Sequence, residues 1–214
     1  MDENPNIKIR AVLFDYGMVL CDMPEAQSWQ RLESILDVEP ERFETLYWRY
    51  RDAYDRGLLG ARTYWETVAR EVDKPLDEQT LQALMDADVV AWTRPNVPMM
   101  EWAERLNRAG IKTGILSNIG DAMEAGILRH FPALAEFSHH TFSHRLGIAK
   151  PDPGSSQQAG GGLGVGAGGI LFVDDKEENI LAARAAGMVG VQYTSHEAFL
   201  EVMERMGLGW LLRL

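Results

Sequence analysis

The chain has 214 residues, enough for one substantial core or for a core domain with a smaller insert, and its 46% hydrophobic and 25% charged residues are ordinary for a globular protein. Its formal net charge of −11 argues against a nucleic-acid or anionic-membrane partner, so any phosphate-binding site must be made electropositive locally. The single cysteine, Cys21, excludes a disulfide framework within the chain. No run of about 18 apolar residues predicts a membrane helix, and no signal peptide is visible. We therefore expect a cytoplasmic protein.

The N-terminal part of the chain predicts a strand followed by an inserted group of helices. Residues 10–14 form an apolar run without helical spacing, which ends at an acid. From about residue 22 to residue 88, apolar and aromatic residues recur at helical intervals, and we predict three or four helices that form a small cap. We interpret Arg49, Arg51 and Arg56 as part of a solvated helix face. The positions that define the helical intervals are Trp29, Leu32, Ile35, Leu36, Phe43, Leu46, Tyr47, Tyr50, Tyr64, Trp65 and Val68.

The rest of the chain alternates helices and strands, which predicts a parallel sheet covered on both faces. We therefore expect an α/β fold, a Rossmann-like parallel sheet with an inserted helical cap. The core domain is expected at residues 1–21 and 93–214, and the cap domain at residues 22–92. The expected core elements are a helix at 99–108, a strand at 112–116, a helix at 121–130, a short strand at 141–143, a strand at 170–173, a helix at 179–186 and a strand at 189–193.

A glycine-rich segment at residues 154–169 conflicts with this alternation, because eight of its sixteen residues are glycine. Composition alone indicates a flexible linker, and each glycine costs a helix roughly 1 kcal/mol relative to alanine. A right-handed crossover between two parallel strands nevertheless needs a covering element at this point. We therefore expect a helix over about 153–162 and expect it to be the least stable helix of the protein.

Four short motifs in a fixed order carry the chemical information. Three follow apolar runs of strand type, so that an acid, a hydroxyl and an acid pair each reach the end of a strand, where ligands bind in an open parallel sheet. A carboxylate nucleophile, a lysine and a second acidic cluster are the groups that phosphoryl transfer through an aspartyl-phosphate requires. Each motif alone also fits a helix cap, a turn or a solvated loop, and it is the ordered set that favours a functional site. The motifs are VLFDYG at 12–17, ILSN at 115–118, KPDP at 150–153 and ILFVDD at 170–175.

With these motifs the chain resembles the haloacid dehalogenase-like hydrolase superfamily, and within it the phosphatases that have a helical cap after the first strand. The resemblance implies that Asp15 is a nucleophile that becomes transiently phosphorylated. It further implies that Ser117 and Asn118 hold the phosphate oxygens. Lys150 would neutralise both the nucleophile and the transferring phosphoryl group.

The same resemblance implies a Mg²⁺ cofactor. Asp15, Asp174, Asp175 and the backbone carbonyl of Gly17 would bind the ion. Mg²⁺ prefers oxygen ligands and usually keeps several waters, so such a set suffices. The expected partner is a small phosphorylated metabolite, and the protein is expected to be a monomer or a homodimer.

Gly17 departs from the family pattern, in which a second aspartate two residues after the nucleophile serves as general acid and base. Three explanations stay open: a leaving group that needs little protonation, a proton from the cap or the substrate, or a slow or inactive enzyme. A subgroup with the similar pattern Phe-Asp-x-Gly-x-Val includes phosphatases of glucose 1-phosphate, whose anomeric oxygen is a comparatively acidic leaving group. This similarity favours the first explanation and a sugar 1-phosphate.

Two alternatives remain beside a phosphatase. A non-catalytic or weakly active phosphate-binding regulatory protein would retain the fold without its acid, although it has little reason to keep a nucleophile. A metal-free dehalogenase of the same superfamily is less favoured, because such enzymes carry a tyrosine at the position of Gly17 and usually lack the acidic pair. The histidines His139, His140 and His144 do not predict a zinc site.

Overall fold

The protein is built on a five-stranded parallel sheet with the strand order β3-β2-β1-β4-β5. The computed structural model describes residues 8–214. From the central strand β1 the chain first extends the sheet on one side through β2 and β3, and then crosses to the other side for β4 and β5. This order places a topological switch point beside β1, where open α/β sheets bind ligands. The strands are β1 (Ala11–Phe14), β2 (Lys112–Ser117), β3 (His139–Phe142), β4 (Ile170–Asp174) and β5 (Val189–Gln192).

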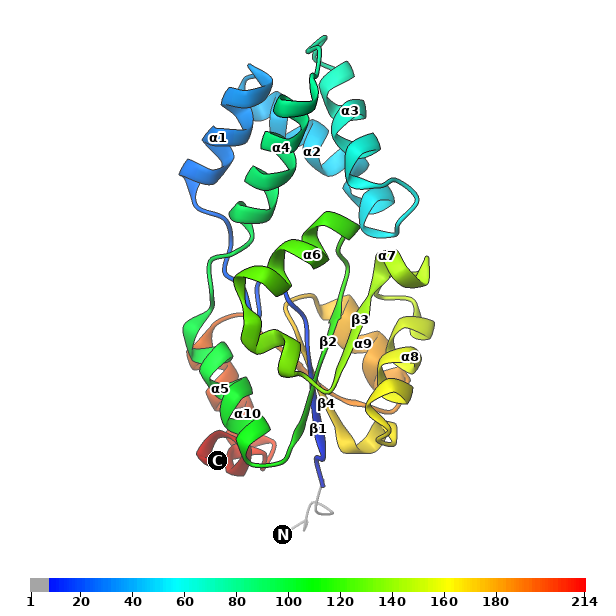
Figure 1. Cartoon of the computed structure of the whole chain (residues 1–214). Helices are drawn as coiled ribbons and strands as arrows, with labels where there is room; N and C mark the ends of the chain where they lie inside the picture. The colour runs from blue at the N-terminus through cyan, green and yellow to red at the C-terminus, as the bar shows by residue number, and fades with distance from the viewer. Residues whose placement is uncertain (1–7) are drawn as a thin grey trace.

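Helices cover both faces of the sheet, as the alternation of elements predicts (Figure 1). Along β1, Ala11 and Leu13 are buried on one face, and Val12 and Phe14 are buried on the other. The first face packs against α8 (Pro153–Leu163) and α9 (Glu177–Ala185), and the second against α5 (Val97–Arg108), α6 (Asp121–His130) and α10 (His196–Arg205). Short helices lie at α7 (Ser143–Leu146), η1 (Pro132–Glu136), η2 (Ala167–Gly169) and η3 (Gly209–Arg213).

Four helices inserted between β1 and α5 form a separate group beyond the carboxyl edge of the sheet, which we call the cap (Figure 1). Tyr47 lies at its aromatic centre, with the rings of Trp29, Phe43 and Tyr64 at centroid distances of 5.0, 5.6 and 6.2 Å. No helix among residues 8–214 is long and apolar enough to cross a membrane. The cap helices are α1 (Ala26–Leu36), α2 (Pro40–Asp55), α3 (Ala61–Arg70) and α4 (Glu78–Ala91).

The two connections between core and cap run beside each other. The backbone N–H of Asp22 donates to the carbonyl of Arg94 at 2.8 Å, and the N–H of Asn96 donates to the carbonyl of Leu20 at 3.0 Å. Cys21 lies between these bonds and is fully buried. Each connection therefore provides hydrogen-bond partners for backbone N–H and C=O groups of the other. Without these bonds the groups would be unpaired near the core.

The glycine-rich segment forms the expected crossover helix, α8. Asp152 caps its start, because the side chain accepts a hydrogen bond from the N–H of Gly154 at 2.8 Å. A Cβ at Gly162 would come within 2.1 Å of the His139 ring, so glycine permits α8 to pack closely on β3. Gly164 ends the helix with a φ of 62°, the left-handed conformation that glycine adopts readily.

Two details of the core differ from the sequence-based prediction. The short strand expected at 141–143 instead spans His139–Phe142, and Ser143 begins α7. The C-terminal helix α10 was not expected, although Ser195 caps it by accepting a hydrogen bond from the N–H of Ala198 at 3.1 Å. Ser195 is typical of a helix start, but the helix has no glycine or proline signal before it.

Candidate functional site

The acidic and basic residues of the motifs meet at the carboxyl edge of the sheet. Asp15 directly follows β1, and Asp174 ends the neighbouring strand β4. The ammonium of Lys150 lies 2.7 Å from Oδ2 of Asp15 and 2.7 Å from Oδ2 of Asp174. All three side chains are buried, so their charges interact with little screening by water. The lysine of the KPDP motif thus contacts an acid of the VLFDYG motif and an acid of the ILFVDD motif.

Burial and the neighbouring charges shift the ionisation of this cluster. Burial raises the pKa of Asp15 to about 7, with Asp174 and Asp175 adding to the shift while Lys150 opposes it. Burial also opposes ionisation of Asp174, but the adjacent Lys150 ammonium and the hydrogen bonds to the carboxylate hold its pKa below the usual value. The pKa of Lys150 is raised, because the two carboxylates outweigh its burial. Lys150 and Asp174 thus form a charged pair beside Asp15.

Asp175 completes an acidic cluster. One carboxylate oxygen from each of Asp15, Asp174 and Asp175 lies within 4.8 Å of the other two. Gly17 lines the same cleft. Three carboxylates facing the single ammonium of Lys150 carry more negative charge than it neutralises, and such an oxygen-rich group suits a hard divalent cation.

Ser117 and Asn118 lie at the end of β2 and line the same cleft. The side-chain amide of Asn118 donates to the backbone carbonyl of Lys150 at 3.0 Å and accepts from its N–H at 2.9 Å. Asn118 thereby fixes the backbone from which the Lys150 side chain reaches the acids. Ser117 is buried at the strand end. All of the residues proposed from the motifs except Asp174 thus line one cleft, and Asp174 is fully buried in contact with Lys150.

Two residues that the sequence analysis missed support this arrangement. Asn179, on α9, donates to Oδ1 of Asp174 at 2.9 Å, while its own Oδ1 is buried with no partner among the described residues. Ser143 accepts a hydrogen bond from the N–H of Ile119 at 3.0 Å and donates to the backbone carbonyl of Asp55 in the cap. An amide five residues after Asp174 is a weak signal for Asn179, and no local pattern distinguishes Ser143.

The cleft lies between the core and the cap and has a volume of about 430 Å³, within the roughly 300–1,000 Å³ typical of small-molecule sites. The motif residues form its floor. The cap side is formed by residues of α2 and of the two connections, namely Met23, Trp48, Arg51, Asp52, Asp55 and Trp92. A molecule bound at Asp15 would therefore contact the cap.

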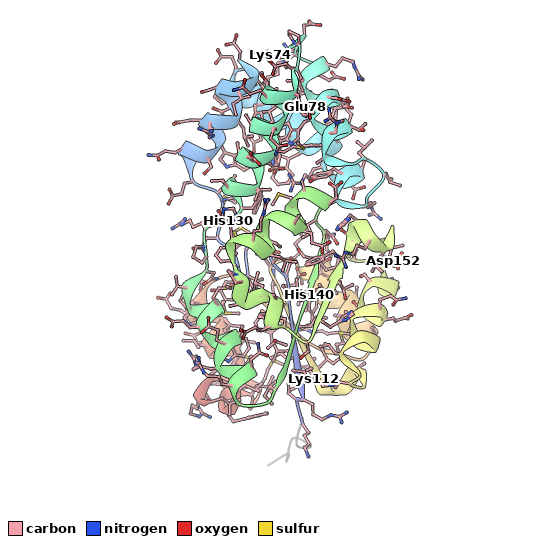
Figure 2. The ribbon with its side chains drawn as sticks, in the orientation of Figure 1. Lys74, Glu78, Lys112, His130, His140 and Asp152 are labelled. Atoms are coloured by element: carbon pink, nitrogen blue, oxygen red, sulfur yellow. The ribbon has the colours of Figure 1, made fainter. Side chains whose placement is uncertain are left out.

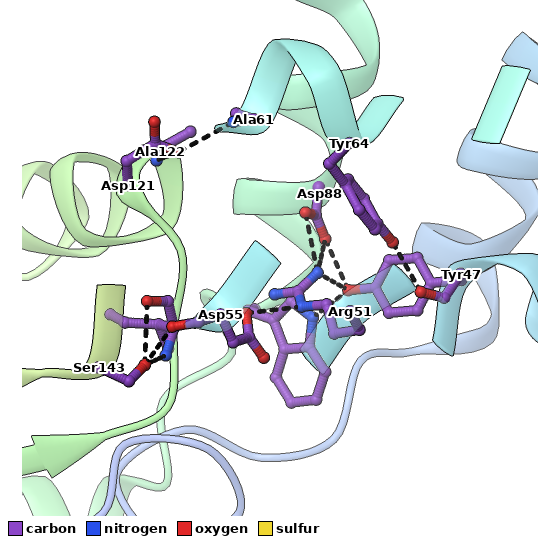
Figure 3. A network of polar contacts seen from close by, with 11 residues as sticks. Tyr47, Arg51, Asp55, Ala61, Tyr64, Asp88, Asp121, Ala122 and Ser143 are labelled. Carbon is purple, nitrogen blue, oxygen red and sulfur yellow. Dashed lines mark hydrogen bonds and ion pairs between the residues drawn. The ribbon is translucent and has the colours of Figure 1, made fainter. Parts of the chain in front are cut away.

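Arg51 does not belong to a solvated helix face, and that interpretation of the sequence was wrong. Its side chain is only 7% exposed and contacts Asp55 at 3.1 Å and Asp88 at 3.1 Å, as the dashed lines of Figure 3 show. Tyr47 donates to the same Asp88 carboxylate at 2.8 Å. Acids on α2 and α4 compensate the buried guanidinium, and the helical spacing of one helix cannot predict such a pairing. Arg49, on the same helix, is exposed as expected.

Two of the three histidines considered in the sequence, His140 and His144, have polar partners in the protein. His140 contacts the carbonyl of Leu134 at 2.7 Å through Nε2, and His144 contacts Glu124 at 2.6 Å. His140 lies in the core, away from the cap (Figure 2). These contacts engage one ring nitrogen each of His140 and His144.

A parallel sheet in this order, with a buried Asp–Lys–Asp cluster at its carboxyl edge, is the arrangement of a haloacid dehalogenase-like hydrolase. A family model described as haloacid dehalogenase-like hydrolase matches residues 9–187, which contain all four motifs. The chain belongs to this family. The more specific similarity to glucose-1-phosphate phosphatases stays a prediction.

Individual proteins similar to this chain share a modest fraction of identical residues with it. Phosphatase MT3486 from Mycobacterium tuberculosis is 27% identical over 188 residues, covering 85% of this chain and 86% of the relative. A phosphoglycolate phosphatase from Neisseria gonorrhoeae is 27% identical over 191 residues, covering 87% of this chain and 80% of the relative. The crystal structure of HAD family enzyme bt-2542 from Bacteroides thetaiotaomicron, a complex with magnesium and inorganic phosphate, has a TM-score of 0.75 at 18% identity and covers 91% of this chain and 98% of that chain. This last similarity concerns the fold.

Proposed function

We propose that the protein is a Mg²⁺-dependent phosphatase that hydrolyses a small phosphorylated metabolite through an aspartyl-phosphate on Asp15. The observation that carries this proposal is the buried contact of Lys150 with both Asp15 and Asp174, at 2.7 Å each, beneath the cleft. A nucleophilic carboxylate that approaches a phosphate dianion is repelled by it. A buried ammonium in contact with that carboxylate reduces the repulsion where it is strongest.

In the proposed reaction, a carboxylate oxygen of Asp15 forms a bond to phosphorus while the bond from phosphorus to the leaving oxygen breaks. The leaving oxygen then takes up a proton. In the second step water attacks the phosphoryl group, releases inorganic phosphate and restores the Asp15 carboxylate. Lys150 would stabilise the equatorial oxygens of the transferring group, with Ser117 and Asn118 as hydrogen-bond donors beside it.

The residues present fit a magnesium ion. Asp15, Asp174 and Asp175 offer carboxylate oxygens within 4.8 Å of one another, and oxygen is the donor that Mg²⁺ prefers. We assign these three carboxylates and the carbonyl of Gly17 as its ligands. The bound ion would neutralise charge on the phosphoryl oxygens and on the cluster. Asn179 would keep Asp174 oriented, since its amide donates to Oδ1 of that residue.

The comparisons support a phosphatase in two ways. Both curated relatives named above carry phosphatase names, and each alignment covers at least 80% of the relative. The structural neighbour of similar fold holds magnesium and inorganic phosphate. A dehalogenase of the metal-free type gains no support from the site, because the acidic cluster of Asp15, Asp174 and Asp175 is complete.

Gly17 favours a substrate whose leaving oxygen needs little protonation. We propose a sugar 1-phosphate as the preferred kind, since its anomeric oxygen leaves more readily than that of an ordinary alcohol. We also propose that residues 22–92 act as the cap domain that selects the substrate, with residues 1–21 and 93–214 as the catalytic core. The cap residues that line the cleft support this division.

Hydrolysis of an aryl phosphate tests the proposal. Turnover by the wild type should require Mg²⁺, should stop with EDTA and should return when excess Mg²⁺ is added. The Asp15→Asn variant should be inactive, because the amide keeps the shape of the side chain but cannot attack phosphorus. Full activity of this variant would contradict Asp15 as nucleophile, and turnover that resists EDTA would contradict the metal.

The absence of an acid at Gly17 also keeps a second function open, a phosphate-binding protein with little or no turnover. Trapping with beryllium fluoride in Mg²⁺ distinguishes the two. A stoichiometric adduct on Asp15 that is absent from Asp15→Asn supports catalysis. Phosphate binding without an adduct and without turnover supports the binding protein.

A further inference from the structure

The second step of the proposed reaction needs a base whatever the substrate is. Once the leaving group has departed, its acidity no longer affects the rate, and the water that attacks the aspartyl-phosphate must still lose a proton. In the family pattern a second aspartate accepts that proton, and this chain has Gly17 in its place. General acid–base assistance contributes roughly 10²–10⁴-fold to a rate. This role is therefore open to another carboxylate at the cleft.

Asp52 and Asp55 of the cap both line the cleft, but their surroundings differ. Both carboxylate oxygens of Asp52 accept from Nε of Arg56 at 2.9 Å, and the Asp52 side chain is 75% exposed. The Asp55 side chain is only 16% exposed. Its Oδ1 accepts from Nε of Arg51 at 3.1 Å, and no hydrogen bond to its Oδ2 occurs among residues 8–214. Asp55 thus has one oxygen that is held in place and one that is available to a water in the cleft.

The backbone of Asp55 is attached to the core beside the residues assigned to the phosphate. The hydroxyl of Ser143 donates to the carbonyl of Asp55, and the same hydroxyl oxygen accepts from the N–H of Ile119 at 3.0 Å (Figure 3). Ile119 lines the cleft and follows directly after Asn118. Through Ser143, the end of α2 that carries Asp55 is therefore fixed to the loop that carries Asn118.

A second attachment holds the cap at the same place. The N–H of Ala61, at the start of α3, donates to Oδ1 of Asp121 at the start of α6, at 3.1 Å (Figure 3). Ala61 and Asp55 lie on either side of the turn that joins α2 to α3. Asp55 thus belongs to the part of the cap that is docked on the core, and it faces the same cleft as Asp15.

The charges around Asp55 suit a base near neutral pH. Burial raises the pKa of Asp55 to about 6, with Arg51 opposing the shift and Asp88 and Asp52 adding to it. On the core side, α7 presents the uncharged hydroxyl of Ser143. A carboxyl with this pKa is mostly ionised at pH 7 and is a stronger base than an ordinary carboxylate. Because it is ionised, it does not protonate the leaving oxygen in the first step, which agrees with a substrate whose leaving oxygen needs little protonation.

We propose that Asp55 of the cap is the general base of the second step. The inference rests on the proposed phosphatase function and adds a catalytic residue to it. The water oxygen forms a bond to phosphorus while the bond from phosphorus to the Asp15 oxygen breaks, and the proton of the water passes to Oδ2 of Asp55. The products are the Asp15 carboxylate and inorganic phosphate, and Asp55 returns its proton to the solvent before the next cycle.

The variant Asp55→Asn tests this assignment, because it separates the two steps. With an aryl phosphate in Mg²⁺, the released aryl alcohol reports the first step and the released inorganic phosphate reports the second. We expect a stoichiometric burst of aryl alcohol, followed by a steady rate at least ~10²-fold below that of the wild type. Asp86→Asn, at an exposed residue of α4 that does not line the cleft, makes the same charge change and should match the wild type. Loss of the burst, or an unchanged steady rate, in Asp55→Asn would overturn the proposal.

The decay of the aspartyl-phosphate provides a test that the wild type alone can answer. Enzyme labelled with ³²P from the substrate is chased with unlabelled substrate at different pH values. Asp15 is esterified during this decay and does not titrate, so the decay should slow below pH about 6 as Asp55 becomes protonated. Decay in Asp55→Asn should be slow and independent of pH over the same range, and formate should accelerate decay in Asp55→Ala by replacing the missing carboxylate. Wild-type decay that does not change with pH would contradict the base.

The same measurements distinguish failure of this base from failure of the phosphatase function. If the wild type releases no aryl alcohol and takes up no label, the phosphatase proposal fails and the base fails with it. If the wild type is labelled and turns over, but Asp55→Asn loses its label at the wild-type rate, only the assignment of Asp55 fails. Label that persists in Asp55→Asn and decays in Asp86→Asn supports both.

Discussion

A Cβ atom placed on Gly17 would lie 3.7 Å from Cζ3 of Trp92, an ordinary van der Waals distance. The φ of Gly17 also lies outside the left-handed region, so neither the backbone nor a steric overlap requires glycine at this position. The chain could carry a side chain here, beside the nucleophile and facing the cap. The absence of an acid therefore bears on chemistry more than on folding.

The first prediction concerns this position. The wild type should cleave glucose 1-phosphate at least 10-fold faster in kcat/KM than glucose 6-phosphate, which corresponds to about 1.4 kcal/mol in transition-state stabilisation. Gly17→Asp should narrow the ratio, mainly by raising the rate on the 6-phosphate, because a carboxylic acid can protonate its poorer leaving group. Gly17→Asn provides the control of equal size without an acid. A wild-type preference for the 6-phosphate would show that another residue supplies the proton.

The second prediction concerns Lys150. Lys150→Met retains the apolar stem and removes the charge, and we expect kcat/KM to fall by at least ~10²-fold, as when an oxyanion-stabilising donor is removed. Lys74→Met is the matched control, since Lys74 lies at the far end of the cap from the core (Figure 2). Lys112 is a poorer control, because its ammonium donates to the carbonyl of Leu163 at 2.8 Å. Similar losses in Lys150→Met and Lys74→Met would indicate an effect of net charge.

The third prediction concerns the cap. Arg51→Met leaves the buried acids Asp55 and Asp88 without their cation, and we expect the free energy of unfolding to fall by about 3–5 kcal/mol. Arg49→Met, on the exposed face of the same helix, should change it by less than about 0.5 kcal/mol. Adding Asp88→Asn to Arg51→Met should recover part of the loss. Chemical denaturation measures all three, and an unchanged midpoint in Arg51→Met would contradict the role of this pair.

The fourth prediction concerns the contact between core and cap. A Cβ at Gly120 would lie 2.1 Å from the Tyr54 ring, so Gly120→Ala should displace α2 and cost about 1–3 kcal/mol. We expect KM to rise as well, because α2 lines the cleft. Gly161→Ala is the contrasting variant, because no atom lies within 4 Å of a Cβ placed at Gly161 in α8. Its free energy of unfolding should rise by up to about 1 kcal/mol, since alanine favours a helix more than glycine does. Thermal unfolding and KM for the preferred substrate provide the measurements. Equal stability of the two variants would exclude tight docking at Gly120.

Much of the fold could be predicted because its signals are local. Apolar runs that end at Asp15 and Asp174 predict buried parallel strands, and helical spacing predicts α1–α3. Even the crossover helix over the glycine-rich segment was predictable, because the topology requires an element there. The boundary of β3 was not, because the strand begins with the polar residues His139 and His140.

The parts of the site that could not be predicted depend on contacts between distant segments. Arg51 and Asp88, which pair between α2 and α4, are 37 residues apart in the sequence, and the hydrogen bond from Ser143 to the carbonyl of Asp55 spans 88 residues. The local sequence around these residues contains no pattern that predicts either contact. The motifs identify the groups that react, whereas the cap that surrounds them follows from tertiary packing.

The paired connections between core and cap limit how the inserted helices can be replaced. Tyr16, directly after the nucleophile, donates through its hydroxyl to the carbonyl of Trp92, and the thiol of Cys21 contacts the same oxygen at 3.1 Å. The returning connection is thus attached to the residue beside Asp15. An insert that replaced the cap would therefore have to keep the carbonyl of Trp92 in place for Tyr16 and Cys21. New specificity is more accessible through single residues of the cleft wall than through replacement of the whole insert.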